Sequence, residues 1–176
     1  ASHAPSTLDD TQAAAMPLTT ITAWELLFDR LQIDAPSPHK KRNLLIIGGA
    51  GGVGSILTQL AVQLTNATVI ATASRPESQQ WVKALGAHHV IDHSKPLGEQ
   101  IESLDIGQVT DVACLTHSEQ YFEQSMAFMA PQGRFSLIDD PAEPLDIRLL
   151  KQKSISLHWE FMYTRSMFTT ADMIKQ

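Results

Sequence analysis

Apolar and polar positions along the chain predict strands and helices in alternation. Leu44 to Ile47 is apolar on both faces, as expected of a buried parallel strand. Five further apolar stretches predict strands at residues 68–73, 89–92, 108–115, 134–138 and 154–159. Segments with helical spacing lie between them, and one of these, which has Pro76 at its first turn, is expected to bury Trp81, Val82 and Leu85. The pattern therefore predicts an α/β fold of the Rossmann type, with a doubly wound, parallel, six-stranded sheet and helices on both faces.

The first predicted strand runs into a glycine-rich turn. Its residues are Gly49, Ala50, Gly51, Gly52, Val53 and Gly54, and a helical pattern follows, so G-x-G-x-x-G stands between a strand and a helix. In this context Gly49 permits the tight turn, Gly51 lets a pyrophosphate approach the backbone, and Gly54 lets the helix pack closely on the strand. The motif predicts dinucleotide binding at the helix N-terminus. A tight turn in some other α/β protein is the alternative.

Ligands of such sheets bind beyond the carboxyl ends of the strands, so the residues there are candidates. The second predicted strand is followed by Ser74 and Arg75, and no acidic residue precedes Glu77. An NAD binder normally has Asp or Glu here for the ribose 2′-hydroxyl. A guanidinium and a hydroxyl suit a 2′-phosphate, so the sequence favours NADP(H) over NAD(H). The alternative is that Arg75 is a solvated residue near a helix start.

Polar residues also follow the next two predicted strands. His93 is a candidate contact at the adenosine phosphate end of a cofactor, with ordinary loop surface as an equal alternative. Thr116 and His117 are candidates for polar contacts with a ribose or nicotinamide. Ser118 is explained by a role as a helix cap.

The end of the fifth predicted strand carries Ile138 and Asp139, which are candidates at the nicotinamide end. Two neighbouring carboxylates invite acid–base chemistry, yet Asp-Asp-Pro at residues 139–141 is also a common turn composition, and the turn is favoured. No spacing typical of a zinc site occurs within the chain. The single cysteine, Cys114, lies in an apolar strand and is expected to pack rather than react.

Composition narrows the class of protein. Of 176 residues, 43% are hydrophobic and 18% charged, which describes an ordinary globular domain. The net charge of −6 and the lack of a basic run argue against nucleic-acid and membrane partners. One cysteine excludes an intramolecular disulfide. Neither a signal peptide nor an apolar run of membrane-spanning length is recognisable, so a cytoplasmic location is the default expectation.

The two ends of the chain suggest a piece of a longer protein, since the first residue is not Met and the last residues look like a starting helix. Residues 1–16 are predicted to be a linker or the remnant of a preceding domain, with a short helix at 7–15. A helix with Pro17 at its start is predicted from about Leu18 to Leu31. We expect a nucleotide-binding domain over 17–165 and the start of a truncated helix at 166–176.

These features together resemble the cofactor domain of medium-chain dehydrogenase/reductases, the superfamily of zinc-type alcohol dehydrogenases and quinone oxidoreductases. The resemblance covers nearly the whole chain, and residues 158–167 look like the zinc-binding alcohol dehydrogenase subgroup. The matching motifs are Leu18-Thr-Thr-Ile-Thr-Ala-Trp-Glu25, Ile47-Gly-Gly-Ala-Gly-Gly-Val-Gly-Ser55, Leu85-Gly-Ala-His-His-Val-Ile-Asp92, Pro131-Gln-Gly-Arg134 and His158-Trp-Glu-Phe-Met-Tyr-Thr-Arg-Ser-Met167.

The resemblance implies an oxidoreductase whose GroES-like catalytic domain and C-terminal return segment are not in this chain. Hydride would pass between NADPH and a small carbonyl, alcohol or conjugated enone held between the domains. Any zinc would belong to the missing domain, and the isolated chain would carry no catalytic residue. By position, Thr22 resembles the threonine near the nicotinamide amide. His93 stands where a tyrosine is frequent, which weakens the case for its contact.

The resemblance and the apolar edge strand together predict a homodimer through residues 154–160. Two other functions are weighed against the enzyme. A non-enzymatic NAD(P)H-sensing module would use the same glycine turn to couple cofactor binding to a partner. A methyltransferase-like domain would need an acidic residue after the second strand, which this chain lacks.

Overall fold

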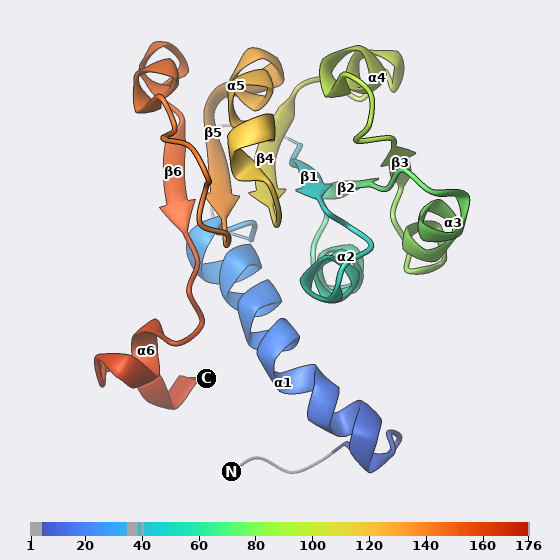
Figure 1. Cartoon of the computed structure of the whole chain (residues 1–176), viewed down its shortest axis with the longest axis vertical. Coiled ribbons are helices and arrows are strands. Elements are labelled where there is room, and N and C mark those ends of the chain that lie inside the picture. Colours follow the sequence, from blue (N-terminus) through green and yellow to red (C-terminus); the bar gives the residue numbers. More distant parts are fainter. Residues whose placement is uncertain (1–4, 35–38, 40, 176) are drawn as a thin grey trace.

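The computed structural model describes residues 5–34, 39 and 41–175. Six strands form one sheet in the order β3-β2-β1-β4-β5-β6, and every neighbouring pair is parallel (Figure 1). This order confirms the predicted Rossmann-type fold, because the chain moves from β1 to one edge and then returns to β4 beside β1. The strands are β1 (Asn43–Ile47), β2 (Thr68–Thr72), β3 (His89–Ile91), β4 (Val109–Cys114), β5 (Met129–Leu137) and β6 (Ser156–Trp159).

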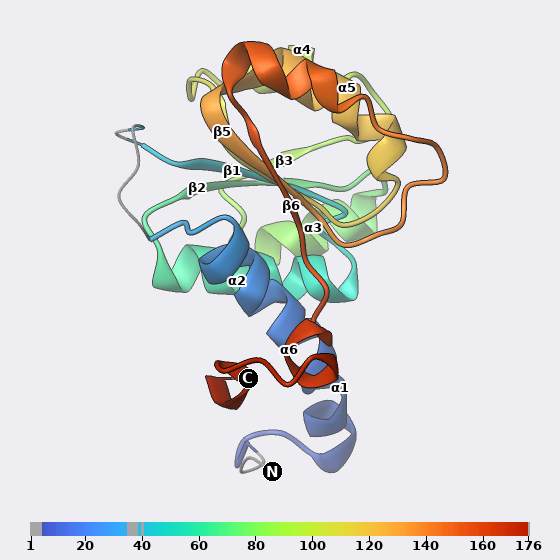
Figure 2. The same cartoon turned by 90° about the vertical axis from the view of Figure 1, so that its left-hand side faces the viewer.

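Helices cover both faces of the sheet, as Figure 2 shows. One face carries α2 (Gly52–Leu64) and α3 (Pro76–Ala84), and the other carries α4 (Leu97–Ser103) and α5 (Ser118–Phe128). A 3-10 helix, η2 (Ile147–Lys153), leads into β6.

The alternation of β1 explains the two main cores. Leu45 and Ile47 belong to the cluster that includes Phe122 of α5, whereas Leu44 and Ile46 belong to the cluster of the α2 face. Since all five residues of β1 are at most 3% exposed, the strand is buried on both sides, as its apolar run predicts.

The first helix begins earlier than the sequence predicts. Helix α1 (Asp10–Trp24) starts at a capping box, in which the Asp9 carboxylate accepts from Gln12 N at 2.8 Å and the Gln12 side chain accepts from Asp9 N at 3.2 Å. The expectation that Pro17 starts a separate helix is therefore wrong, because Pro17 lies inside α1. The helix continues as a π-helix, η1 (Glu25–Arg30).

Two other expectations need correction. Trp81 of α3 is 51% exposed rather than buried, and its indole Nε1 donates to Ser55 Oγ at 2.8 Å. The C-terminal residues form two short turns, α6 (Thr164–Met167) and η3 (Met173–Lys175), instead of one starting helix. Thr169 has φ +47° between them, a left-handed conformation that interrupts a helix. No helix among the described residues is both long and apolar enough to cross a membrane.

Candidate functional site

The glycine turn after β1 is held in place by Thr72 at the end of β2. Gly48 N donates to Thr72 Oγ1 at 3.0 Å, and Gly49 N donates to the Thr72 carbonyl at 3.2 Å. Thr72 is fully buried, so this double contact is shielded from water. The turn is therefore positioned by the neighbouring strand as well as by its own glycines.

Three glycines of the turn have different reasons to lack a side chain. A Cβ on Gly49 would stand 2.8 Å from Ala71 Cβ, and one on Gly54 would stand 2.7 Å from Gly49 Cα, so both allow close packing. A Cβ on Gly51 would meet only the Gly48 carbonyl, at 3.4 Å. Gly51 is also exposed, with an ordinary φ of −73°. The absence of a side chain at Gly51 thus leaves open space that a ligand can occupy.

The N-terminus of α2 opens onto the same space. Gly51 is its N-cap and offers no side-chain hydrogen bond to the first turn. The free backbone N–H groups of that turn and the positive end of the helix dipole favour an anion. This geometry fits a pyrophosphate on the glycine turn.

A cleft of about 550 Å³ lies beside the turn, over the carboxyl ends of β1 to β5. Most of the predicted binding residues line it, and the structure thus brings together positions that lie up to 88 residues apart, from Ala50 to Ile138. The predicted residues at the cleft are Ala50, Gly51, Gly52, Val53, Gly54, Ser74, Arg75, His93, Thr116 and Ile138.

The cleft also contains residues that the sequence did not single out. Ser78 is the most informative, because it lies one helical turn after Arg75, the N-cap of α3. The Ser78 hydroxyl donates to the Arg75 carbonyl at 2.9 Å and accepts from Arg75 N at 3.2 Å. Its position three residues after the N-cap of a helix was the signal in the sequence that could have identified Ser78. The others are Gly48, Thr72, Ala73 and Leu115.

The charge that the described residues bring to the cleft lining is positive. None of the described residues that line it is acidic, and Arg75 is its permanent cation. Arg75 is exposed, and no ion pair joins its guanidinium to a described carboxylate. Lys95, by contrast, pairs with Asp92 at 3.8 Å and does not line the cleft. His93 lines the cleft and is half-buried.

Four predicted residues lie outside the cleft lining. Thr22 is buried in α1, where its hydroxyl donates to the Leu18 carbonyl at 2.9 Å. Gly49 is buried beneath the turn. His117 is exposed at φ +48°, with its Nδ1 2.6 Å from Thr116 Oγ1.

The fourth, Asp139, caps a helix. Its Oδ2 accepts from Ser118 N at 2.9 Å, so a carboxylate at the end of β5 satisfies the first turn of α5. The expectation that Ser118 provides this cap is wrong, because Ser118 Oγ is buried without a hydrogen-bond partner among the described residues. Trp159 Nε1 donates to the Asp139 carbonyl at 3.1 Å. This turn therefore joins α5 to β6.

Cys114 packs rather than reacts, as its apolar strand indicates. The side chain is fully buried, its Sγ donates to the Thr116 carbonyl at 3.4 Å, and burial raises the pKa of the thiol to about 12. The reactive thiolate is therefore suppressed at neutral pH. Within residues 5–34, 39 and 41–175, no group of three or more His, Cys, Asp or Glu side chains is arranged to hold a metal ion.

Comparison with known proteins points to one family. The model of the zinc-binding dehydrogenase family matches residues 52–176. A zinc-type alcohol dehydrogenase-like protein of Staphylococcus epidermidis is 40% identical over 173 residues, which are 98% of this chain and 51% of that protein. The chain thus spans about half the length of the curated relatives that it matches.

Solved structures agree with this result. A protein from Rhizobium etli CFN 42, classed as a zinc-dependent alcohol dehydrogenase, is 55% identical with a TM-score of 0.95, over 99% of this chain and 51% of that one. A mycobacterial protein complexed with NADPH is 26% identical with a TM-score of 0.75, over 97% and 54% of the two chains. An NAD-dependent alcohol dehydrogenase is 25% identical with a TM-score of 0.79, over 96% and 48%. Structures similar to this chain therefore include proteins of either nicotinamide cofactor.

Proposed function

Because the chain belongs to the zinc-binding dehydrogenase family, we propose that it is the cofactor-binding domain of an NADP(H)-dependent oxidoreductase. The complete protein would transfer hydride to or from a small carbonyl, alcohol or enone. The observation that carries the proposal is the cleft, in which an open glycine turn and a helix N-terminus face Ser74 and Arg75 across the end of β2.

The choice of NADP(H) rests on charge. A 2′-phosphate needs a cation and hydrogen-bond donors, whereas a free 2′-hydroxyl is normally bound by a carboxylate. The described lining of the cleft has no carboxylate, and the Arg75 guanidinium forms no ion pair with a described residue that a phosphate would have to displace. Ser74 and Ser78 lie beside it with hydroxyl groups. These side chains favour the phosphorylated cofactor.

The chain's own residues would bind and orient the cofactor. The first backbone N–H groups of α2 would hold the pyrophosphate, and Thr72 would keep the turn in position for it. When bound, the nicotinamide supplies the hydride chemistry. Ile138, at the opposite side of the cleft from Arg75 in the strand order, would offer an apolar surface that excludes water. The substrate and its catalytic groups would come from the remainder of the protein.

Calorimetric titration of the chain with NADPH and NADH tests this proposal. We expect tighter binding of NADPH, and an Arg75→Ala variant that loses about 10–100-fold in NADPH affinity, the worth of one charge-assisted contact, with little change for NADH. Lys95→Ala is the matched control, since it removes a nearby cation outside the cleft. Equal affinities of the two cofactors, or equal losses in both variants, would refute the assignment of Arg75. If the chain alone binds neither cofactor measurably, the same titrations are carried out with full-length zinc-type relatives.

A further inference from the structure

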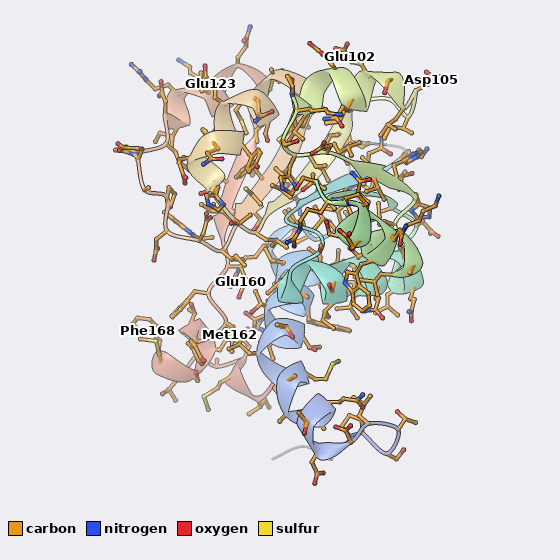
Figure 3. All side chains as sticks on the ribbon, turned by 45° about the vertical axis from the view of Figure 1, so that its right-hand side comes forward. Glu102, Asp105, Glu123, Glu160, Met162 and Phe168 are labelled. Atoms are coloured by element: carbon orange, nitrogen blue, oxygen red, sulfur yellow. The ribbon has the colours of Figure 1, made fainter. Side chains whose placement is uncertain are left out.

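Two carboxylates are buried together where the chain leaves the sheet. Glu25 in η1 is 1% exposed, and Glu160, directly after β6, is 2% exposed. Figure 3 shows Glu160 between the sheet and the C-terminal turns. Both side chains contact Arg30, whose Nη2 lies 4.0 Å from Glu25 Oε2 and whose Nε lies 2.7 Å from Glu160 Oε2. An ionised carboxylate only accepts hydrogen bonds, so a hydrogen bond between the two would require a proton on one of them.

Two arginines surround the pair. Arg30 Nε donates to Glu160 Oε2 at 2.7 Å. Arg165, in α6, reaches back across the junction and binds three carboxylates at 2.7, 2.8 and 3.0 Å, those of Glu25, Asp29 and Asp172. Thr170 Oγ1 also donates to Asp172 at 2.7 Å. The C-terminal segment, residues 161–172, is therefore attached to η1 mainly through charged groups.

Among the described residues, carboxylates outnumber guanidinium groups in this network. Four carboxylates, of Glu25, Asp29, Glu160 and Asp172, face the two guanidinium groups of Arg30 and Arg165. The neighbouring groups on β5 and β6 are Arg134 and His158, and burial together with Arg134 and Arg30 lowers the pKa of His158. This environment disfavours the charged form of His158. The side chains of Asp29 and Asp172 are 35% and 42% exposed, so the buried carboxylates are those of Glu25 and Glu160. Two carboxylates that share a buried site favour retention of a proton on one of them.

We propose that Glu25 and Glu160 share one proton, and that loss of this proton loosens the C-terminal segment from η1. The junction is then a clamp that closes when protonated and opens when deprotonated. It adjoins the cleft, because Glu160 N donates to the Leu137 carbonyl at 2.9 Å, one residue before Ile138 in the cleft lining. The ends of β5 and β6 are thus directly connected to the clamp.

The sign of the pH dependence follows from linkage. Burial first, and then the hydrogen bond to Glu25, raise the pKa of Glu160 from 4.5 to about 7. A carboxyl whose pKa is raised in the clamped state favours that state fully below its ordinary value, and this contribution is lost as the pH rises through about 7. For release to a solvated carboxyl, these two values give an opening constant about tenfold higher at pH 8.5 than at pH 6.

Amide hydrogen exchange of the 176-residue chain measures this opening. Four amides report on the segment, since their N–H groups donate to carbonyls within it: those of Thr164, Met167, Phe168 and Thr170. We expect their protection factors, corrected for intrinsic rates, to fall about tenfold between pH 6 and pH 8.5. The amide of Leu115, bonded to the Ile47 carbonyl in the sheet, is the internal control and should not change.

Variants separate the shared proton from general stability. Glu160→Gln keeps a neutral hydrogen-bonding group, so protection at pH 8.5 should stay at its pH 6 value. Asp172→Asn removes a partner of Arg165 and should lower protection equally at both pH values. A tenfold pH response that persists in Glu160→Gln would overturn the proposal, as would a wild-type segment with no pH response.

Infrared difference spectroscopy on the wild-type chain tests the proton itself, even if Glu160→Gln fails to fold. A carbonyl stretch of a protonated carboxyl at pH 6 that disappears by pH 8.5 is the expected result. Its absence at pH 6 would show that both carboxylates are ionised and would refute the shared proton.

Discussion

Adding one methyl group at Gly51 and, separately, at Gly54 is expected to distinguish cofactor binding from folding. The two glycines lie three residues apart in the same turn, but a Cβ meets very different surroundings at each. On Gly54 it would overlap the carbonyl of Gly48 and lie 2.7 Å from both Gly49 Cα and the Gly49 carbonyl. On Gly51 the nearest atom of the protein is the Gly48 carbonyl at 3.4 Å, an ordinary contact.

The expected magnitudes follow from these contacts. Gly54→Ala gains up to about 1 kcal/mol in helix propensity, but backbone atoms must move to admit the methyl group, so we expect a net loss of about 2–4 kcal/mol in the free energy of unfolding. Gly51→Ala loses a favourable N-cap residue, at about 0.5–1 kcal/mol, and regains a similar amount from a less flexible unfolded chain. Its stability should therefore stay close to that of the wild type.

Gly51→Ala should instead impair cofactor binding and leave folding intact. The methyl group of Gly51→Ala projects into the space assigned to the pyrophosphate, so NADPH affinity should fall at least tenfold, or about 1.4 kcal/mol, in a fully folded protein. Urea denaturation gives the stability of each variant, and calorimetric titration gives its affinity. A Gly51→Ala protein that binds NADPH as tightly as the wild type would refute the placement of the pyrophosphate, and one as unstable as Gly54→Ala would refute the packing argument.

Three further outcomes are expected. Arg42→Ala should lower the free energy of unfolding in urea by about 3–5 kcal/mol, because Asp111 is 1% exposed and loses its contacts with Arg42 at 2.6 and 2.7 Å. Asp111→Asn in the same chain should restore part of this stability. No restoration would contradict an uncompensated charge as the cause. Ser156→Lys on the edge strand β6 should lower the dimer fraction in light scattering at an unchanged melting temperature, whereas a wild type that is monomeric at high concentration would refute a dimer through β6. Cys114 should resist alkylation at pH 8 until the chain is unfolded, and rapid labelling of the folded chain would contradict its burial.

Elements with a strong local signal were predictable. All six strands were found from apolar runs, most clearly β1 and β4, which are buried along their whole length, whereas the edge strand β6 is partly exposed and β5 begins at Met129 rather than at residue 134. The start of α3 was found because Pro76 suits the first helical position after Arg75. The start of α1 was missed, since the Asp9–Gln12 capping box carries less apolar signal than the segment from Leu18 onward. Trp81 was misplaced because helical spacing does not reveal that Ser55 offers its indole a hydrogen bond at the surface.

The candidate site shows the same division. The glycine turn and the residues after each strand were found in the sequence, because the chemistry of a βα turn depends on neighbours along the chain. The roles of Thr72 and Asp139 were not found, since each contact joins a strand end to the backbone of another element. Ser78 lines the cleft because α3 places its first residues beside the glycine turn, and this arrangement is a property of the tertiary structure.

The sequence by itself determined the succession of strands and helices, the glycine turn and the absence of an acidic residue after β2. These features depend on side-chain size, apolar periodicity and backbone freedom over a few residues. Only the tertiary structure decided which strand ends border one cleft, and that Arg165 would bind Glu25, 140 residues away, beside Glu160. Such contacts follow from the order of the strands and the path of the chain after β6, which no local pattern encodes.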